Sequence, residues 1–192
     1  MVESSIFNYV GIMIWAAVLI LSIGSYLYNP RGFTAEGIAA FFERFETGIL
    51  LAYAAFSILR GFTLLPSTPL VIAGTLLFPQ QPWLVLFISI TGILISSTLI
   101  YFCSDLLGFT DYFQKKYFKV TERIRRRLET PAGVMFVFLW AFFPLVPTDA
   151  VCYVAGTAKM VFAKFILAIF LGELVLCSSY IFLGGYIRNL AF

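Results

Sequence analysis

The sequence contains no histidine, and only 12% of its 192 residues are charged. Without imidazole there is no Ser-His or Cys-His catalytic pair, and the usual zinc sites lose a principal ligand. The three cysteines, Cys103, Cys152 and Cys177, lie far apart in apolar stretches and form no CxxC motif, so we interpret them as core residues. We therefore expect neither an enzyme nor a protein that carries a metal or an organic cofactor.

Apolar residues, in contrast, are abundant. They make up 61% of the chain, and 22 of its residues are phenylalanine. A soluble domain averages about 45–50% apolar residues, and a chain this apolar would expose large hydrophobic patches to water. The composition predicts an integral membrane protein of one domain.

Three apolar stretches are long enough to cross about 30 Å of hydrocarbon as helices. They are Tyr9–Leu27, Trp83–Cys103 and Val161–Tyr186. The first has no basic segment before it and no small-residue cleavage site after it, so we interpret it as a transmembrane helix rather than a signal peptide.

Two further apolar stretches are interrupted by a P-x-x-P motif, beginning at Pro66 and at Pro144. Proline lacks an amide hydrogen and disfavours the helical conformation of the preceding residue, so each motif should break its helix. The segments after the breaks are too short to cross a bilayer. We predict two re-entrant hairpins, Gly48–Phe78 and Pro131–Lys159, which must pack within protein or line a wet cavity. The alternative is that each motif only kinks a core helix.

The two interrupted stretches resemble each other. PSTPLVIAGT (66–75) and PLVPTDAVCYVAGT (144–157) share the proline motif and a following Ala-Gly-Thr, and the crossings behind them carry Gly92 and Gly172. One hairpin is expected to open outward and the other inward. This pattern predicts an inverted repeat, which in transporters places the substrate site between the two broken segments.

Basic residues set the expected topology. Seven of the 13 lie in the loop 105–130, which the positive-inside rule places in the cytoplasm together with the N-terminus. Apolar residues at helical spacing in this loop, and again within 33–45, predict amphipathic helices on the inner and outer surfaces of the membrane. For the basic loop, the simpler interpretation is a topology signal with some attraction to anionic lipid.

These elements define the expected architecture, an all-α polytopic membrane protein in two parts. Residues 1–47 would form the N-terminal transmembrane helix and an interfacial helix, and residues 48–187 the inverted repeat. The second part would contain, in order, hairpin 48–78, helix 83–103, the basic loop 105–130, hairpin 131–159 and helix 161–187.

The starts of the two half-helices form the candidate site. Ser67 and Thr68 precede a proline, which suits an N-cap followed by proline in the first turn. Thr148 and Asp149, after Pro147, offer the same start to the second half-helix. Helix N-termini that meet in the membrane favour an anion, and phosphate in particular.

Charged side chains within the apolar stretches support this site, because each is costly at membrane depth unless it is paired or functional. Arg60, on the inbound arm of the first hairpin, could pair with a phosphate or a carboxylate. Asp149 is either a structural N-cap or a functional group that titrates or pairs with Arg60. Glu173 lies near the expected midplane, where burial favours the neutral acid, so it could carry a proton.

The segments RGFTLLPSTPLVIAGTLLFP, FFPLVPTDAVCYVAG and KFILAIFLGE resemble the VTT-domain proteins of the DedA superfamily, also called the SNARE-associated Golgi protein family. The resemblance covers roughly residues 45–185. It implies two opposed re-entrant hairpins. It also implies translocation of phospholipids or polyprenyl phosphates, coupled to protons in some bacterial members, and scrambling of phospholipids in eukaryotic relatives.

The residues that match the motifs of this family are Arg60, Pro66, Gly74, Pro144, Pro147, Asp149, Tyr153 and Gly156. Glu46 lies in a segment resembling the one that carries a functional glutamate in DedA proteins. Trp140 stands where many members have an arginine, a departure from the family pattern.

We therefore expect a transporter that moves a phosphate-bearing lipid between leaflets, with membrane lipids and protons as partners and no nucleic acid, in the inner membrane of a bacterium. The alternatives are a membrane assembly or homeostasis factor without transport, and a small-ion or solute transporter. The expected proton-coupling residues are Asp149, Glu173 and Glu46. The expected substrate-binding residues are Arg60, Pro66, Ser67, Thr68, Gly74, Pro144, Pro147, Thr148, Asp149, Tyr153 and Gly156.

Overall fold

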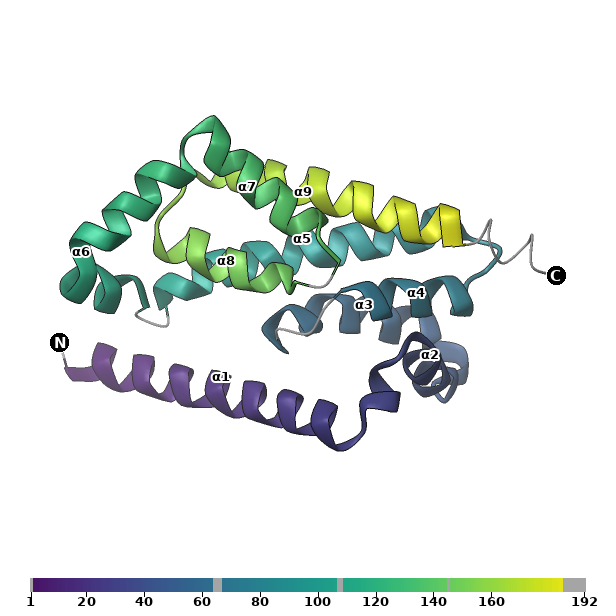
Figure 1. Cartoon of the computed structure of the whole chain (residues 1–192). Helices are drawn as coiled ribbons and strands as arrows, with labels where there is room; N and C mark the ends of the chain where they lie inside the picture. Colours follow the sequence, from purple (N-terminus) through teal and green to yellow (C-terminus); the bar gives the residue numbers. More distant parts are fainter. Residues whose placement is uncertain (1, 64–66, 107–108, 145, 185–192) are drawn as a thin grey trace.

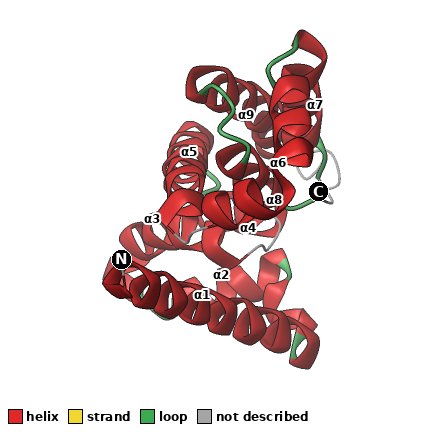
Figure 2. Cartoon of the chain, turned by 90° about the vertical axis from the view of Figure 1, so that its left-hand side faces the viewer, coloured by secondary structure: helices red, strands yellow, loops and turns green. Residues whose placement is uncertain are grey.

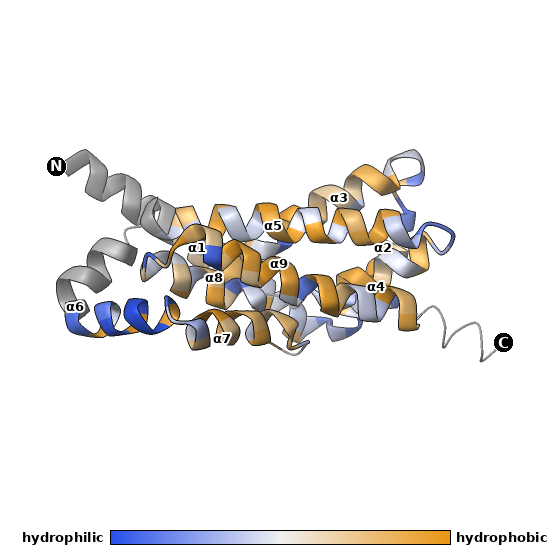
Figure 3. Ribbon diagram, turned by 90° about the horizontal axis from the view of Figure 1, so that it is seen from above, coloured by the Kyte–Doolittle hydropathy of each residue, from blue (hydrophilic) through white to orange (hydrophobic). Residues whose placement is uncertain are grey.

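The computed structural model describes residues 2–63, 67–106, 109–144 and 146–184, and the regular elements of these residues are all helices (Figure 1). The predicted all-α class is confirmed. Polar residues gather at the two ends of the elongated molecule, and the stretch between them is dominated by apolar residues (Figure 3). An apolar middle between polar ends is the distribution that a bilayer requires.

The N-terminal part contains α1 (Val2–Tyr28), the 3-10 turn η1 (Pro30–Phe33) and α2 (Ala35–Glu43). Thr34 caps α2, because its side-chain oxygen accepts a hydrogen bond from the amide of Gly37 at 3.2 Å. The predicted interfacial segment thus contains a short helix, in which Phe42 is buried and Phe41 is exposed.

The first interrupted stretch contains η2 (Glu46–Gly48), α3 (Ile49–Leu59), η3 (Arg60–Thr63) and α4 (Thr68–Leu77). The chain bends by 117° between α2 and the helical stretch Glu46–Thr63. The predicted break at the first proline motif falls between η3 and α4, and Pro66 itself lies outside the described residues.

The remaining elements are α5 (Pro82–Leu106), α6 (Phe109–Leu128), α7 (Pro131–Phe142), α8 (Thr148–Thr157), α9 (Phe162–Ser178) and the π-helical turn η4 (Ser179–Leu183). The basic loop is therefore largely helical, as its apolar spacing predicted. The helix breaks between α7 and α8, at the second proline motif.

Within the described part of the chain, two helical stretches are long and apolar enough to cross a membrane, Pro82–Ser104 and Phe162–Leu183. They match two of the three predicted crossings, and the bent pair of α2 with α3 and η3 would make a third if it counts as one span. The predicted N-terminal crossing corresponds to α1, whose segment Ala16–Tyr28 is apolar but, taken alone, shorter than a membrane span. These helices identify an integral membrane protein.

The main core lies between α5, α7, α8 and α9, where α7 packs along α9 and α8 packs along α5 (Figures 1 and 2). A second, smaller cluster of Phe42, Tyr53 and Leu70 joins α2, α3 and α4. Helix α1 runs along one side of this assembly and contacts η1 and η3. Each arm of the broken helices therefore packs against a long helix, α3, α4 and α8 against α5 and α7 against α9.

Candidate functional site

An ion pair joins the two halves of the chain. Arg60 lies where α3 passes into η3, and Asp149 lies in the first turn of α8. Nη1 of Arg60 is 3.6 Å from Oδ2 of Asp149, and both side chains are almost completely buried. The guanidinium and the carboxylate, predicted from the sequence as possible partners, therefore lie together.

A second carboxyl group lies beside the same break. Glu173, in the middle of α9, is fully buried, and its Oε1 accepts a hydrogen bond from the hydroxyl of Thr148, the first residue of α8. Its other oxygen is 3.8 Å from the thiol of Cys177, which donates to it. The break before α8 is thus surrounded by one buried cation and two buried acids.

The broken backbone is also linked directly. The hydroxyl of Thr68, at the start of α4, donates to the carbonyl of Pro144 at 3.3 Å. The indole of Trp140 donates to the carbonyl of Pro147 at the same distance. A broken helix leaves carbonyl groups without helical partners, so these two bonds stabilise a break that membrane depth would otherwise penalise.

The predicted N-caps need correction. Ser67 occupies the N-cap position of α4 but makes no capping hydrogen bond with its side chain. The N-cap of α8 is Pro147, so the interpretation of Asp149 as an N-cap is wrong. Helix α8 begins one residue before Asp149, and the Asp149 carboxylate pairs with Arg60 instead. The hydroxyl of Thr148 is likewise used by Glu173.

Other predicted site residues lie in helix contacts. A side chain at Gly74 would collide with the hydroxyl of Tyr53, and one at Gly156 would collide with the backbone of Tyr101. Tyr153 packs half-buried against the main core. These positions let α4 and α8 approach their neighbours closely, so they support the buried charged groups through helix packing.

Glu46 lies elsewhere. It begins the turn η2 between α2 and α3, has a left-handed φ of 39°, and is exposed. The structure does not bring it to the buried acids.

Sequence reasoning missed a set of buried hydroxyl groups behind Arg60. The hydroxyls of Tyr53 and Ser89 are 3.1 Å apart, and Ser57 donates to the carbonyl of Tyr53 at 2.8 Å. All three side chains are buried. A signal was present, because serines inside membrane stretches commonly form contacts between helices.

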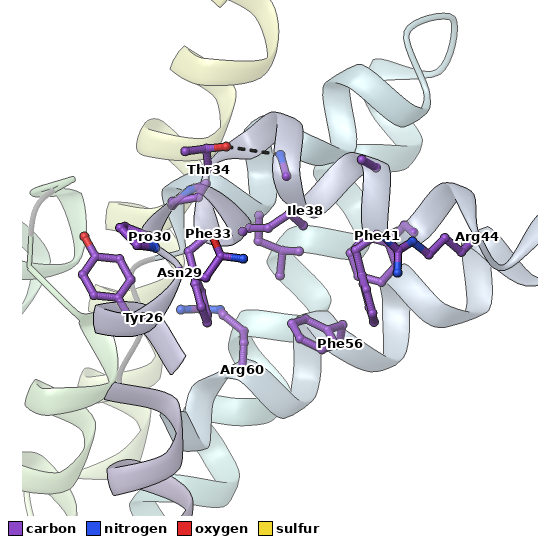
Figure 4. A pocket seen from close by; sticks show the side chains of 16 residues that line it. Tyr26, Asn29, Pro30, Phe33, Thr34, Ile38, Phe41, Arg44, Phe56 and Arg60 are labelled. Carbon is purple, nitrogen blue, oxygen red and sulfur yellow. Dashed lines mark hydrogen bonds between the residues drawn. The ribbon is translucent and has the colours of Figure 1, made fainter. Parts of the chain in front are cut away.

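Three cavities meet at Arg60. The largest, of about 780 Å³, opens between η1, α2 and α3, and the guanidinium points into it (Figure 4). A second, of about 260 Å³, lies between α1 and η3. The third, of about 10 Å³, is lined by Arg60 and three buried serines, Ser57, Ser67 and Ser89. Arg60 therefore contributes to the walls of two larger cavities, although its side chain, like that of Asp149, is almost completely buried.

Comparison with known proteins adds one assignment. Residues 65–186, more than half of the chain, match the family described as the VTT domain. No curated protein and no solved structure matches.

Proposed function

This chain belongs to the VTT-domain family of DedA and SNARE-associated Golgi proteins, and from that premise we propose that it carries a phosphate-bearing lipid between the two leaflets of a membrane. The substrate would be a phospholipid or a polyprenyl phosphate, and no covalent step is involved. One observation carries the proposal: a buried guanidinium, Arg60, lies beside Asp149 where the two helix breaks meet and faces a large cavity. A guanidinium matches the geometry and charge of a phosphate, and it has no role in an ordinary apolar core.

In this mechanism Asp149 neutralises Arg60 while the site is empty. An arriving phosphate takes over the guanidinium, so neither state leaves the cation without a counterion. Ser67, at the start of the first half-helix, would donate a hydrogen bond to the headgroup, while the hydroxyls of Thr68 and Thr148 stay bound to Pro144 and Glu173. The helix N-termini would add favourable dipoles. The headgroup would thus cross the apolar middle without being transferred into hydrocarbon.

We further propose that the half-helices belong to two re-entrant hairpins related as an inverted repeat, with the N-terminus in the cytoplasm and the protein in a bacterial inner membrane. Matching contacts in the two halves support the repeat. Gly92 of α5 lies against Ser57 of α3, and Gly172 of α9 lies against Phe138 of α7. In each half, a glycine of the long helix brings the inbound arm close.

Exchange of fluorescent lipid in liposomes tests the function. The purified protein is reconstituted with labelled phosphatidylglycerol or polyprenyl phosphate, and dithionite then quenches the label that reaches the outer leaflet. Wild type should expose inner-leaflet label faster than empty liposomes. Arg60→Lys should be slower, because lysine keeps the charge but loses the two-pronged geometry. The combined Arg60→Met and Asp149→Leu variant should have no exchange above that of empty liposomes.

A wild-type rate equal to that of empty liposomes would contradict transport of these lipids. Substituting Leu51, an exposed residue of α3, by alanine controls for nonspecific effects on reconstitution. If cells that depend on this protein grow as well with the combined variant as with wild type, the ion pair serves only to hold the two helix breaks together, as expected for an assembly factor.

Proton coupling follows from the charges at the break. One guanidinium cannot neutralise two buried acids, so a proton on one acid lowers the electrostatic cost of the site. We expect leaflet exchange to accelerate as pH falls, because protonation leaves Arg60 available to phosphate. Glu173→Gln keeps a hydrogen-bond acceptor for Thr148 but cannot titrate, so its pH profile should be flatter. Profiles of wild type and Glu173→Gln that coincide would exclude Glu173 from coupling.

A further inference from the structure

The first of the cavities at Arg60 has aromatic walls and two arginines. Its volume of about 780 Å³ falls within the range of about 300–1,000 Å³ that is typical of small-ligand sites. Phe33 and Phe41 reach it from η1 and α2, and Phe56 reaches it from α3 (Figure 4). Arg60 approaches it from the side of α3, and Arg44 contributes to its wall at the end of α2. The cavity therefore offers an apolar interior next to a buried cation.

The second cavity meets the same cation from another direction. Leu21, Ser22 and Ser25 of α1 line it, and it shares Phe33, Phe56 and Arg60 with the first cavity. The two phenylalanines therefore lie at the boundary between the two spaces. One guanidinium is bordered by two apolar cavities.

We propose that these cavities hold the two acyl chains of a glycerophospholipid whose phosphate binds Arg60, with Phe33 and Phe56 lying between the chains. The proposal rests on the proposed transport of a phosphate-bearing lipid and names its class. One anionic group with two chains matches one cation with two apolar cavities. A polyprenyl phosphate has one chain and would leave a cavity without its hydrocarbon, and inorganic phosphate would use neither.

The residues that line the two cavities indicate which part of the protein would select lipids with two acyl chains. All those of the second cavity, and all but Pro69 and Leu70 of the first, precede residue 65, where the match to the VTT domain begins. Selection of the chains would thus be carried by the N-terminal part, α1 to η3. The two buried acids, Asp149 and Glu173, lie within the region that matches the VTT domain.

Filling each cavity separately tests the proposal. Ala40, exposed on α2, lines the first cavity, and Ser22 of α1 lines the second. Ala40→Trp and Ser22→Trp would each place a large side chain in one cavity, where it competes with an acyl chain. The matched controls are Leu51→Trp on α3 and Ile23→Trp on α1, because both are exposed apolar residues that line neither cavity. Ala40→Leu and Ser22→Leu are milder forms, used if a tryptophan variant does not elute as a single folded species.

Binding to the full-length protein in detergent is measured by native mass spectrometry for phosphatidic acid, its one-chain lyso form, polyprenyl phosphate and inorganic phosphate. Wild type should prefer phosphatidic acid to the lyso form by about tenfold or more. Each filling variant should bind phosphatidic acid about tenfold more weakly than wild type does. Its affinity for the lyso form should be nearly unchanged, because a single acyl chain can use the cavity that stays open. The variant with both cavities filled should bind both lipids more weakly, and the control variants should bind both as wild type does.

Three results would overturn the proposal. They are equal affinity of wild type for phosphatidic acid and its lyso form, equal weakening by filling and control variants, and tighter binding of polyprenyl phosphate than of phosphatidic acid. The transport proposal fails separately. If chain binding follows the two cavities but labelled lipid is not exchanged, transport is wrong and the chain site stands. If exchange depends on Arg60 while binding ignores both fillings, the chain site is wrong and transport stands.

Discussion

Replacing Asp149 by alanine is expected to lower the free energy of unfolding by about 3–5 kcal/mol, because the buried Arg60 guanidinium would lose the carboxylate that lies 3.6 Å from it. The effect is large against a total stability of about 5–15 kcal/mol for a typical protein. Unfolding by sodium dodecyl sulfate in mixed micelles, followed by the fluorescence of the three tryptophans, measures it.

The combined replacement of Arg60 by methionine and Asp149 by leucine is the informative control. Removing both charges also removes the cost of burying them, so this variant should lie within about 1 kcal/mol of wild type. Glu173 keeps the hydroxyl of Thr148 as its donor in the variant. If Asp149→Ala alone is as stable as wild type, Asp149 is not the counterion that holds Arg60 in place.

The two variants separate the structural and functional roles of the ion pair. A pair that only held the helix breaks together would be replaceable by apolar side chains, since burial of charge rarely adds net stability. The transport proposal predicts the opposite division, a folded combined variant that exchanges no lipid. Stability and lipid exchange measured on the same preparation therefore decide whether the ion pair only holds the helix breaks together or takes part in lipid transport.

The central pair could be predicted from the sequence because its signals are local. An arginine and an aspartate inside apolar stretches are costly alone, and each lies near a proline motif that breaks its helix. The predicted breaks, the two long crossings and the helix in the basic segment follow from the same kind of information. Proline chemistry and apolar length act on a few neighbouring residues, whatever the rest of the fold does.

The contacts around the pair depend on packing and could not be predicted. Glu173 was expected near the midplane, but its bond to Thr148 requires the particular rotation of α9 against α8. The hydroxyl contact of Tyr53 with Ser89 likewise requires α3 to face α5. Of the two alternatives for Asp149, the N-cap was wrong because α8 begins at Thr148, and the pairing with Arg60 is the one that the structure contains. The cavities depend on the 117° bend before α3, which no local pattern indicates.

Gly156→Ala is expected to destabilise the protein by about 1–3 kcal/mol, the usual cost of overpacking. A Cβ there would collide with the backbone of Tyr101 and the hydroxyl of Ser104, and backbone atoms cannot rotate away as a flexible side chain can. Alanine gains about 0.8–1.0 kcal/mol of helix propensity over glycine, which offsets only part of this cost. Helix α8 would have to move away from α5, and Asp149, at the other end of α8, would move with it.

Gly24→Ala in α1 is the matched control, because a Cβ at that position has no described atom within 4 Å. It gains the same helix propensity without a collision, so it should be as stable as wild type or slightly more stable. Detergent unfolding compares the two variants, and lipid exchange in liposomes shows whether the shifted α8 still presents Asp149 to Arg60. Because the close approach of α8 to α5 positions the carboxylate, exchange should fall for Gly156→Ala even where the protein stays folded. Unchanged stability and exchange in Gly156→Ala would mean that this close contact does not position the ion pair.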